Sequence, residues 1–238
     1  MRFRLQTRPV ALFGAMFVIA LLLLLPLRLV AGWAGLDDAG LSARAVQGSV
    51  WYGSLDEAAI GGIALGDLRA HLSPLNLLLG RARVMVRSNG ATPAAQGAVT
   101  VSRHSYGVNV VTASVPTGAV FAPLPIAQLD LSAAGVRFED GRCARAAGHV
   151  RAVVTGAIAG VDLGGSMAGD ARCEAGVLVL PLRAAAGGAA IELRLPGNGR
   201  FHASLTVPAS DAATIARLQR AGFQAGPGGY RLSAEGRF

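Results

Sequence analysis

The chain opens with a long apolar run and then changes to short segments in which apolar and polar residues alternate. From Val10 to Leu27, eighteen residues pass without a charged side chain. As an α-helix, such a run extends about 27 Å, close to the thickness of the hydrocarbon core of a bilayer. The pattern predicts a cytoplasmic tail over residues 1–9, a transmembrane anchor over 10–30, a linker over 31–40 and an exported β-rich domain over 41–238.

The charges around this run predict its orientation. Arg2, Arg4 and Arg8 precede it, whereas Asp37 and Asp38 follow it. Basic residues are retained on the cytoplasmic side of a membrane. The N-terminus is therefore predicted to be cytoplasmic, and the following domain is predicted to lie outside the cytoplasm.

A cleavable signal peptide is the alternative interpretation of the same run. Signal-peptide apolar regions are usually about 7 to 15 residues long, and this run is longer. The small residues Gly32 and Ala34 form only a poor cleavage site, beyond Arg28. Arg28 and Trp33 instead suit the headgroup region of a membrane, and Pro26 falls where the last helical turn is expected. An uncleaved anchor is favoured.

Beyond the anchor, the pattern is typical of β-strands. Between Arg81 and Arg87, apolar residues alternate with arginine or methionine, which predicts a strand with one solvated face. Glycine-rich turns separate the other apolar segments. Strands are predicted at Leu41–Trp51, Leu55–Leu65, Asp67–Leu72, Arg81–Arg87, Gly97–Ser102, Tyr106–Val115, Ile126–Phe138, Arg142–Thr155, Ile158–Ala168, Gly176–Leu182, Ala189–Leu195, Arg200–Val207 and Tyr230–Arg237.

Two short helices interrupt this series. Ser73 and Pro74 match a helix start, and Gly80 matches its end. A second helix begins at Ser210 or Asp211 and ends at Gly222. The predicted fold is mainly β: one N-terminal transmembrane helix, then a curved, largely antiparallel sheet with one or two short helices.

Composition and charge refine this picture. The formal net charge is +8, and every basic residue is arginine. A GC-rich coding bias accounts for this most simply, and a phosphate-binding surface is the alternative. The arginines are scattered singly along the sequence, and aromatic residues make up only 5% of it. The sequence therefore predicts no nucleic-acid partner.

Two cysteines, Cys143 and Cys173, lie in the predicted exported domain. An even number of cysteines in an oxidising compartment favours a structural disulfide. Two separate buried thiols are the alternative. Two thiolates alone provide only half of a zinc shell, and no histidine lies at ligand spacing.

Residues that could carry catalysis do not form a recognisable motif. Ser166 is followed by Ala168 where a nucleophile elbow requires glycine. The acidic pairs Asp56–Glu57 and Glu139–Asp140 are expected at turns. The four histidines are dispersed along the chain: His71, His104, His149 and His202. The sequence thus predicts no catalytic residue, no cofactor and no metal site, and favours a protein that is not an enzyme.

A family resemblance adds to this interpretation. The segments Gly48–Gly53, Gly62–Leu68 and Leu72–Gly80, with their tryptophan–glycine and proline–leucine patterns, resemble the N-terminal half of the type II secretion system protein N family. The second half of the same family is resembled by Cys143 and by the segment from Gly169 to Glu174, which contains Cys173. The resemblance covers nearly the whole chain.

This resemblance implies a bitopic accessory protein of the inner membrane with a periplasmic C-terminal domain. Its implied partners are other secretion-system proteins, such as the inner-membrane platform and the outer-membrane secretin. The alternative is an AsmA-like or lipopolysaccharide-bridge-like protein that binds or transfers lipid in an apolar groove. Gly62–Gly66 and Gly160–Gly164 share a short pattern that would suit such a repeat.

Overall fold

A computed structural model describes residues 9–33, 35, 40–61, 63–90, 95–117, 120–158, 160–163, 165–185 and 187–237. The helices are α1 Pro9–Leu23, α2 Leu27–Trp33, α3 Pro74–Leu78 and α4 Ala212–Arg220. The strands are β1 Leu41–Ser42, β2 Ala45–Gly48, β3 Gly53–Ile60, β4 Ile63–Leu72, β5 Ala82–Ser88, β6 Gln96–Val101, β7 Ser105–Pro116, β8 Ile126–Glu139, β9 Arg142–Val154, β10 Ala157–Ile158, β11 Val161–Asp162, β12 Ser166–Asp170, β13 Arg172–Glu174, β14 Val177–Ala184, β15 Ala190–Leu195, β16 Arg200–Val207, β17 Gln224–Gly226 and β18 Gly229–Arg237.

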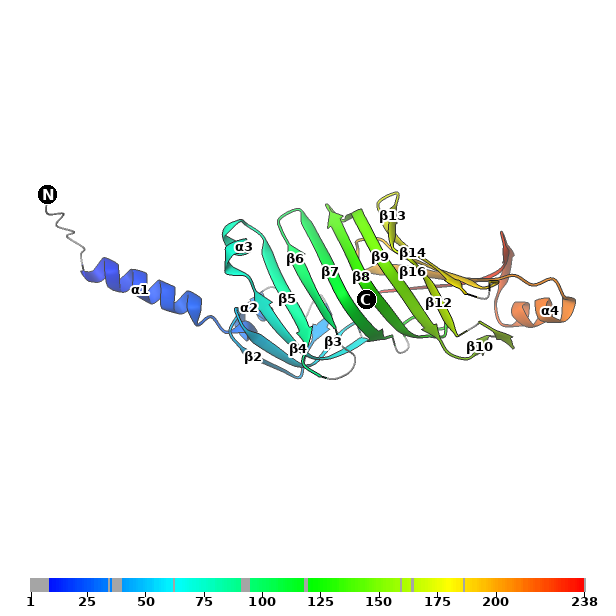
Figure 1. Ribbon diagram of the computed structural model, residues 1–238, viewed down its shortest axis with the longest axis horizontal. Helices are drawn as coiled ribbons and strands as arrows, with labels where there is room; N and C mark the ends of the chain where they lie inside the picture. Colours follow the sequence, from blue (N-terminus) through cyan, green and yellow to red (C-terminus); the bar gives the residue numbers. More distant parts are fainter. Residues whose placement is uncertain are drawn as a thin grey trace.

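A single antiparallel sheet of 16 strands organises the molecule, and β10 and β11 form a separate pair. The sheet order is β1-β3-β4-β5-β6-β7-β8-β9-β12-β14-β15-β16-β18-β17, so nearly every strand lies beside its neighbour in sequence. The predicted mainly β, antiparallel fold with a few short helices is confirmed. Figure 1 shows the sheet along the long axis, with α1 projecting at one end and α4 at the other.

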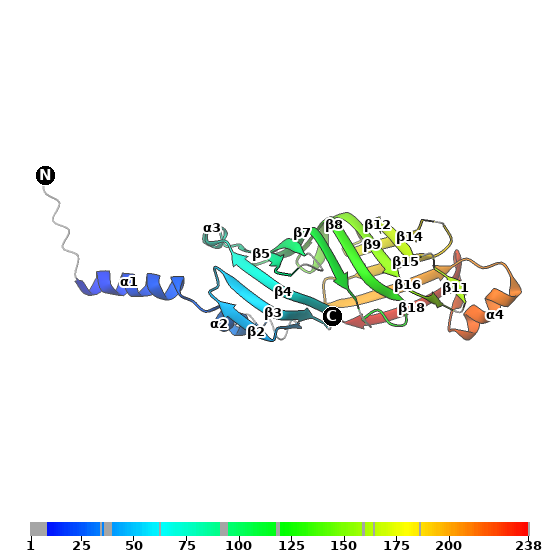
Figure 2. The same cartoon turned by 60° about the horizontal axis from the view of Figure 1, so that its bottom comes forward.

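The hydrophobic core belongs to the C-terminal half of this sheet. The sheet curves so that β15, β16 and β18 lie across from β8 and β9 (Figure 2). Side chains from both layers meet between them, and Met167, Ala203 and Leu205 are fully buried there. Phe121 and Leu124 add to the same core from the segment between β7 and β8.

Among the described residues, no comparable second layer covers the N-terminal half. Its buried apolar residues are few and mostly small: Val50, Ala58, Leu68, Leu72, Ala98 and Ala113. On β6 and β7, Val101, Tyr106 and Val108 are 39% to 48% exposed although they lie on the same face of the sheet as the core. The apolar face of the sheet therefore continues beyond the region where the protein covers it.

The N-terminal apolar run is divided into α1 and α2. The helix ends before Pro26, because proline lacks an amide donor and disfavours helical geometry in the residue before it. The chain there pairs with the domain instead: Pro26 bridges Ser49, and the Val50 amide donates to the Leu25 carbonyl at 3.0 Å. The interpretation of Pro26 as part of the last helical turn is wrong.

In the part of the chain that the structure describes, no helix is long and apolar enough to cross a membrane. Half of the predicted linker lies outside the described residues, namely residues 34 and 36–39. So do the charged residues used to orient the segment: Arg2, Arg4, Arg8, Asp37 and Asp38.

Several strand limits differ from those predicted. Leu41–Trp51 forms two short strands, β1 and β2, and both pair with β3. Leu55–Leu65 is divided by the β3–β4 turn, where Gly61 adopts a φ of +55°. Asp56 and Glu57 lie inside β3 at a register shift, not at a turn, whereas Asp140 and Gly141 do form the β8–β9 turn.

The predicted strand Ile158–Ala168 is three elements: β10, β11 and β12. Gly62 and Gly164 lie outside the described residues, and the segments that share their pattern differ in structure. The first contributes to β4 of the large sheet, whereas the second contributes to β11 of the separate pair.

Both predicted helices of the domain are confirmed. Ser73 and Pro74 begin α3. Asp211 caps α4, where its Oδ1 accepts a hydrogen bond from the Thr214 amide at 2.8 Å. Phe223 then folds back on Leu218, and both side chains are buried in the core.

Candidate functional site: an arginine-lined face

The candidate site lies on the sheet face opposite the core, across strands β4 to β9. Cross-strand register fixes which residues share this face. On β5 to β9, Arg83, Thr100, Gly107, Arg137 and Arg145 are successive partners and form one row across five strands. Because side chains alternate along each strand, residues two positions away lie on the same face. We call Arg69, Arg81, Arg83, Arg87, Arg137 and Arg145 the arginine face.

Two pairs of arginines on this face are direct cross-strand partners. Arg69 on β4 is opposite Arg87 on β5, and Arg137 on β8 is opposite Arg145 on β9. Like charges directly opposite each other destabilise a sheet. Each of the two arginine pairs therefore places two positive charges side by side on one face, and this repulsion lowers the stability of the fold.

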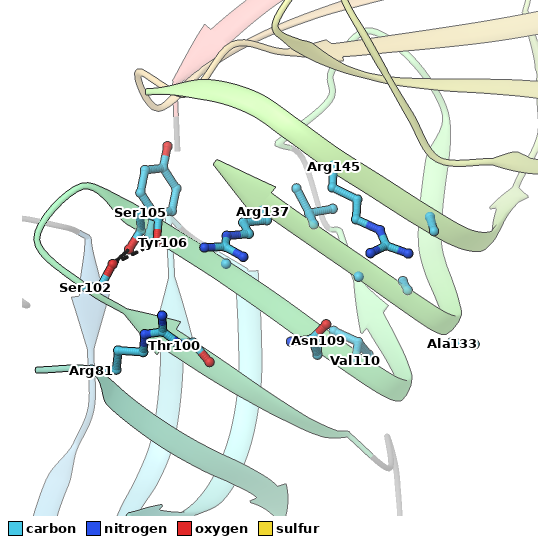
Figure 3. Close-up of a pocket in the computed structure, with 15 residues that line it drawn as sticks. Arg81, Thr100, Ser102, Ser105, Tyr106, Asn109, Val110, Ala133, Arg137 and Arg145 are labelled. Carbon is cyan, nitrogen blue, oxygen red and sulfur yellow. Dashed lines mark hydrogen bonds between the residues drawn. The ribbon is translucent and has the colours of Figure 1, made fainter. Parts of the chain in front are cut away.

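A hollow of about 640 Å³ lies over the strands that carry the second pair. Figure 3 shows Arg81, Arg137 and Arg145 around this hollow, with Arg137 directed toward the strand that carries Thr100. Asn109 and the hydroxyl groups of Ser102 and Ser105 add uncharged polar groups to its lining. The Ser102 and Ser105 hydroxyl oxygens lie 2.7 Å apart and hold the β6–β7 turn together.

The absence of a side chain at Gly107 leaves space at the base of this hollow. A Cβ atom at Gly107 would come within 2.7 Å of the Val136 carbonyl oxygen on the neighbouring strand. No side chain fits at that position without a shift of the backbone. The space between Thr100 and Arg137 in the row thus stays open.

A second hollow, of about 760 Å³, accompanies the first arginine pair. Arg69, Arg87 and Met85 line it, together with Tyr52 and His71. The rings of Tyr52 and His71 lie 4.5 Å apart between centroids, and the His71 Nδ1 lies 2.6 Å from the Trp51 carbonyl oxygen. A carbonyl oxygen can only accept, so His71 donates from Nδ1 and its ring is held in one orientation.

Few acidic groups neutralise the arginine face. Arg137 pairs with Glu139 at 3.1 Å. Among the described residues, the other five arginines of the face form no salt bridge and no side-chain hydrogen bond: Arg69, Arg81, Arg83, Arg87 and Arg145. Their side chains are exposed. The face therefore offers guanidinium groups with free donors, which suit carboxylate or phosphate oxygens.

This clustering changes the interpretation drawn from the sequence. Along the chain the arginines stand singly, but antiparallel pairing brings residues as far apart as Arg69 and Arg145 onto one face. In the sequence, only the Arg81–Arg87 alternation indicated that arginines share one face. The clustering of the other arginines depends on the register of the strands from β5 to β9, which composition does not provide.

The opposite face has its own connection to the C-terminal half. The Tyr106 hydroxyl donates to the Gly197 carbonyl oxygen at 2.8 Å, and its ring stacks on Phe138 with 5.0 Å between centroids. Partial burial raises the pKa of the Tyr106 hydroxyl above its ordinary value. Gly197 lies in the turn between β15 and β16.

The residues singled out in the sequence lie apart from the arginine face, except His71. Cys143 and Cys173 form a disulfide with 5.6 Å between Cα atoms, linking β9 to β13. Ser166 begins β12. The other three histidines each lie 3.1 to 3.4 Å from a different carboxylate: His104 from Asp140, His149 from Asp170 and His202 from Glu235.

Metal chemistry has no obvious centre in the described ranges. Within them, no group of three or more histidine, cysteine, aspartate or glutamate side chains lies close enough together to hold a metal ion.

An open antiparallel sheet with an uncovered apolar face and an arginine-lined face defines this chain as a β-sheet protein built to present surfaces. Comparison with protein families identifies which one: residues 39–233 match type II secretion system (T2SS), protein N, and the chain belongs to that family. Comparisons with curated proteins and with solved structures gave no match.

Proposed function

We propose that the protein is a non-enzymatic accessory component of the type II secretion system, which exports folded proteins across the outer membrane. The observation that carries this proposal is the family match, which spans residues 39–233 and thus nearly all of the β-domain. The protein acts by contact with other components, and the two contrasting faces of its sheet are the surfaces available for it.

The proposal includes a tether to the inner membrane. The apolar run over residues 10–30 would anchor the chain once, with residues 1–9 in the cytoplasm and residues 41–238 in the periplasm. Supporting this, the apolar side chains around α1 are exposed on all sides: Leu12, Phe13, Met16, Phe17, Val18, Ile19, Leu21 and Leu23. A helix that is apolar all round is suited to a lipid or protein environment and not to water.

The partners we propose are the inner-membrane platform and the outer-membrane secretin. A second candidate function is lipid binding, as in AsmA-like or lipopolysaccharide-bridge-like proteins. The exposed apolar side chains of Val101, Tyr106 and Val108 favour it, because an acyl chain could cover this part of the sheet. Lipid binding would use this apolar face alone, whereas contact with secretion components can use either face.

Site-specific photocrosslinking in cells can test both candidates. A photoreactive residue replaces Thr100 on the arginine face or Val108 on the apolar face of the full-length protein. The adducts are then analysed for both protein and lipid. Crosslinks from either position to secretion components support the proposed function. Phospholipid or lipopolysaccharide adducts at Val108, with no secretion protein at either position, would replace it with lipid binding.

N-terminal sequencing of the mature protein tests the tether. We expect an intact N-terminus, because the apolar run is predicted to be uncleaved. A mature chain beginning near Gly35 would show that the segment is a signal peptide, and the domain would then be free of the anchor.

A further inference from the structure

We propose that the arginine face binds an extended acidic segment of a partner protein, whose carboxylates engage the two opposed arginine pairs. This inference rests on the proposed function and deepens it, because it names the surface through which the protein contacts a partner. The partner is defined by its chemistry: carboxylate side chains on an extended chain.

The first argument is the charge that the sheet keeps in place. Arg69 is directly opposite Arg87, and Arg137 is directly opposite Arg145, so both pairs repel internally. A bound carboxylate between two guanidinium groups would remove this repulsion and accept charge-assisted hydrogen bonds from both. Arg137 already has one carboxylate neighbour, Glu139, at 3.1 Å, which shows that this chemistry is accommodated on the face.

The second argument is that each pair has its own hollow. Arg137 and Arg145 line the hollow of about 640 Å³, and Arg69 and Arg87 line that of about 760 Å³. A third opposed pair, Arg200 and Arg237 on β16 and β18, lines neither of these hollows. An opposed arginine pair therefore lies beside a hollow at two places on the arginine face. The Arg200–Arg237 pair has the same charge but lines neither hollow, so it serves as a matched control.

The spacing of the two pairs sets the length of the segment. They are four strand positions apart in the sheet and four residues out of register, which corresponds to about 23 Å along the face. An extended chain covers that distance with about seven residues. Arg83 lies on β5 like Arg87, and in the same row as Arg137, so a further guanidinium group flanks this path.

The shape of the molecule favours a protein partner over a membrane surface. In Figures 1 and 2, α1 leaves the domain roughly along the long axis, whereas the faces of the sheet are turned to the side. With α1 inserted in a bilayer, the arginine face would look sideways along the membrane and not onto it. A protein standing beside the domain can reach this face.

The test uses full-length protein in nanodiscs made of zwitterionic lipid. The probe is a rhodamine-labelled peptide of twelve residues in which glutamate and serine alternate, and the corresponding glutamine–serine peptide is the control. We expect the glutamate peptide to bind and the glutamine peptide to fail. Arg137→Glu with Arg145→Glu should weaken binding about tenfold or more, since two charge-assisted contacts are lost. Arg69→Glu with Arg87→Glu should have a similar effect.

The control variant is Arg200→Glu with Arg237→Glu, which makes the same change in net charge at a pair outside the hollows. It should change peptide affinity less than about twofold, apart from the general electrostatic effect that added salt screens. Equal losses in all three double variants would show that only net charge matters and would overturn the proposal. Thermal unfolding of each variant separates loss of binding from loss of fold.

A parallel measurement with phosphatidylglycerol vesicles separates the two anionic partners. If the Arg137–Arg145 variant loses vesicle binding while its peptide binding is unchanged, the face binds membranes and the proposal is wrong. The proposed function has a separate readout in the photocrosslinks. Peptide binding without crosslinks to secretion components would overturn the function but leave the acidic-segment site intact. Crosslinks that persist in a variant without peptide binding would overturn only the site.

Discussion

The two halves of the sheet differ in what stabilises them. In the C-terminal half, β8 to β18 curve into two layers with a shared core, and the disulfide between Cys143 and Cys173 ties two of its strands together. In the N-terminal half, β3 to β7 form one layer, with mainly small buried residues and with exposed apolar side chains on the inner face. The same antiparallel pairing continues through both halves.

This difference separates stability from binding. Burial of apolar surface is the main source of folding free energy, so the C-terminal half anchors the fold. The N-terminal half depends on its pairing with that anchor. It contains the Arg69–Arg87 pair and the uncovered apolar side chains of β6 and β7, which are features that reduce stability when no partner is present. The second arginine pair, Arg137–Arg145, lies on β8 and β9, where the two halves meet. Functional surfaces are commonly placed in such less stable regions.

Removing the disulfide should have the largest effect on the free energy of unfolding. Cys143→Ala with Cys173→Ala opens a loop of 30 residues, so the chain-entropy model predicts a loss of about 4 kcal/mol. Chemical denaturation of the variant and of the reduced wild-type protein measures it. Hydrogen exchange should rise first in β9 and β13. A rise of equal size confined to β4–β6 would contradict the division into two halves.

A matched pair of methionines tests the division next. Met167 on β12 is fully buried, whereas Met85 on β5 is 41% exposed. Met167→Ala should destabilise the protein by about 3 kcal/mol because it leaves a cavity in the core. Met85→Ala should cost less than about 1 kcal/mol. Denaturation midpoints at constant m-value measure both. Equal losses would show that the N-terminal half is packed as tightly as the C-terminal half.

The cap of α4 should contribute less to stability than the disulfide or Met167, and its contribution should depend on pH. The Thr214 amide bonds to Asp211 and lowers the pKa of that carboxyl below its ordinary value. A lowered pKa stabilises the fold above the unfolded-state pKa, and this contribution is lost as pH falls through the folded-state value. Asp211→Ala should therefore lower the Tm at pH 7, and the difference from wild type should shrink at the acidic limit.

Asp211→Asn is the control for this prediction. Asparagine also caps helices, so it should retain most of the stability at pH 7 but lose the part that depends on pH. If the alanine and wild-type proteins differ by the same amount at pH 7 and at the acidic limit, the carboxylate charge is not responsible.

The smallest expected effect has the opposite sign. Arg87→Thr removes the repulsion with Arg69 and places a residue with high strand propensity on β5. It should raise stability by a few tenths of a kcal/mol, and added salt should reduce the gain. The comparison variant is Arg83→Thr, since Arg83 is opposite Thr100 and not another arginine. A larger gain at Arg83 would show that the opposed pair is not the source of the effect.

Much of the fold followed from local patterns. Alternation between Arg81 and Arg87 predicted β5, and capping residues predicted α3 and α4. These signals lie within a few residues of one another, and the forces that produce them are equally local. The strand errors arose where a turn falls inside an apolar run, as at Gly61, since periodicity alone does not show where a strand reverses.

The candidate site was harder to predict, because it depends on register. Arg137 and Arg145 are eight residues apart, with a turn between them, and their pairing depends on a register shift in which β9 carries one extra residue. Predicting that they face each other required the position of that shift. Gly107, which keeps the hollow open, lay within the predicted strand Tyr106–Val115, and nothing in its neighbours along the chain marked a close approach of the next strand. The cysteines were the exception, since chemistry marks them without reference to pairing.

The near-sequential strand order has a consequence for how the chain is assembled. When the N-terminus emerges first from a ribosome or a translocation channel, each new strand can join the edge left by the one before it, because its partner is already present. The single-layered half is therefore complete before the strands that cover β8 and β9 arrive. During synthesis the apolar face of those two strands stays open to chaperones, and the arrival of β18 is the event that ends this exposure.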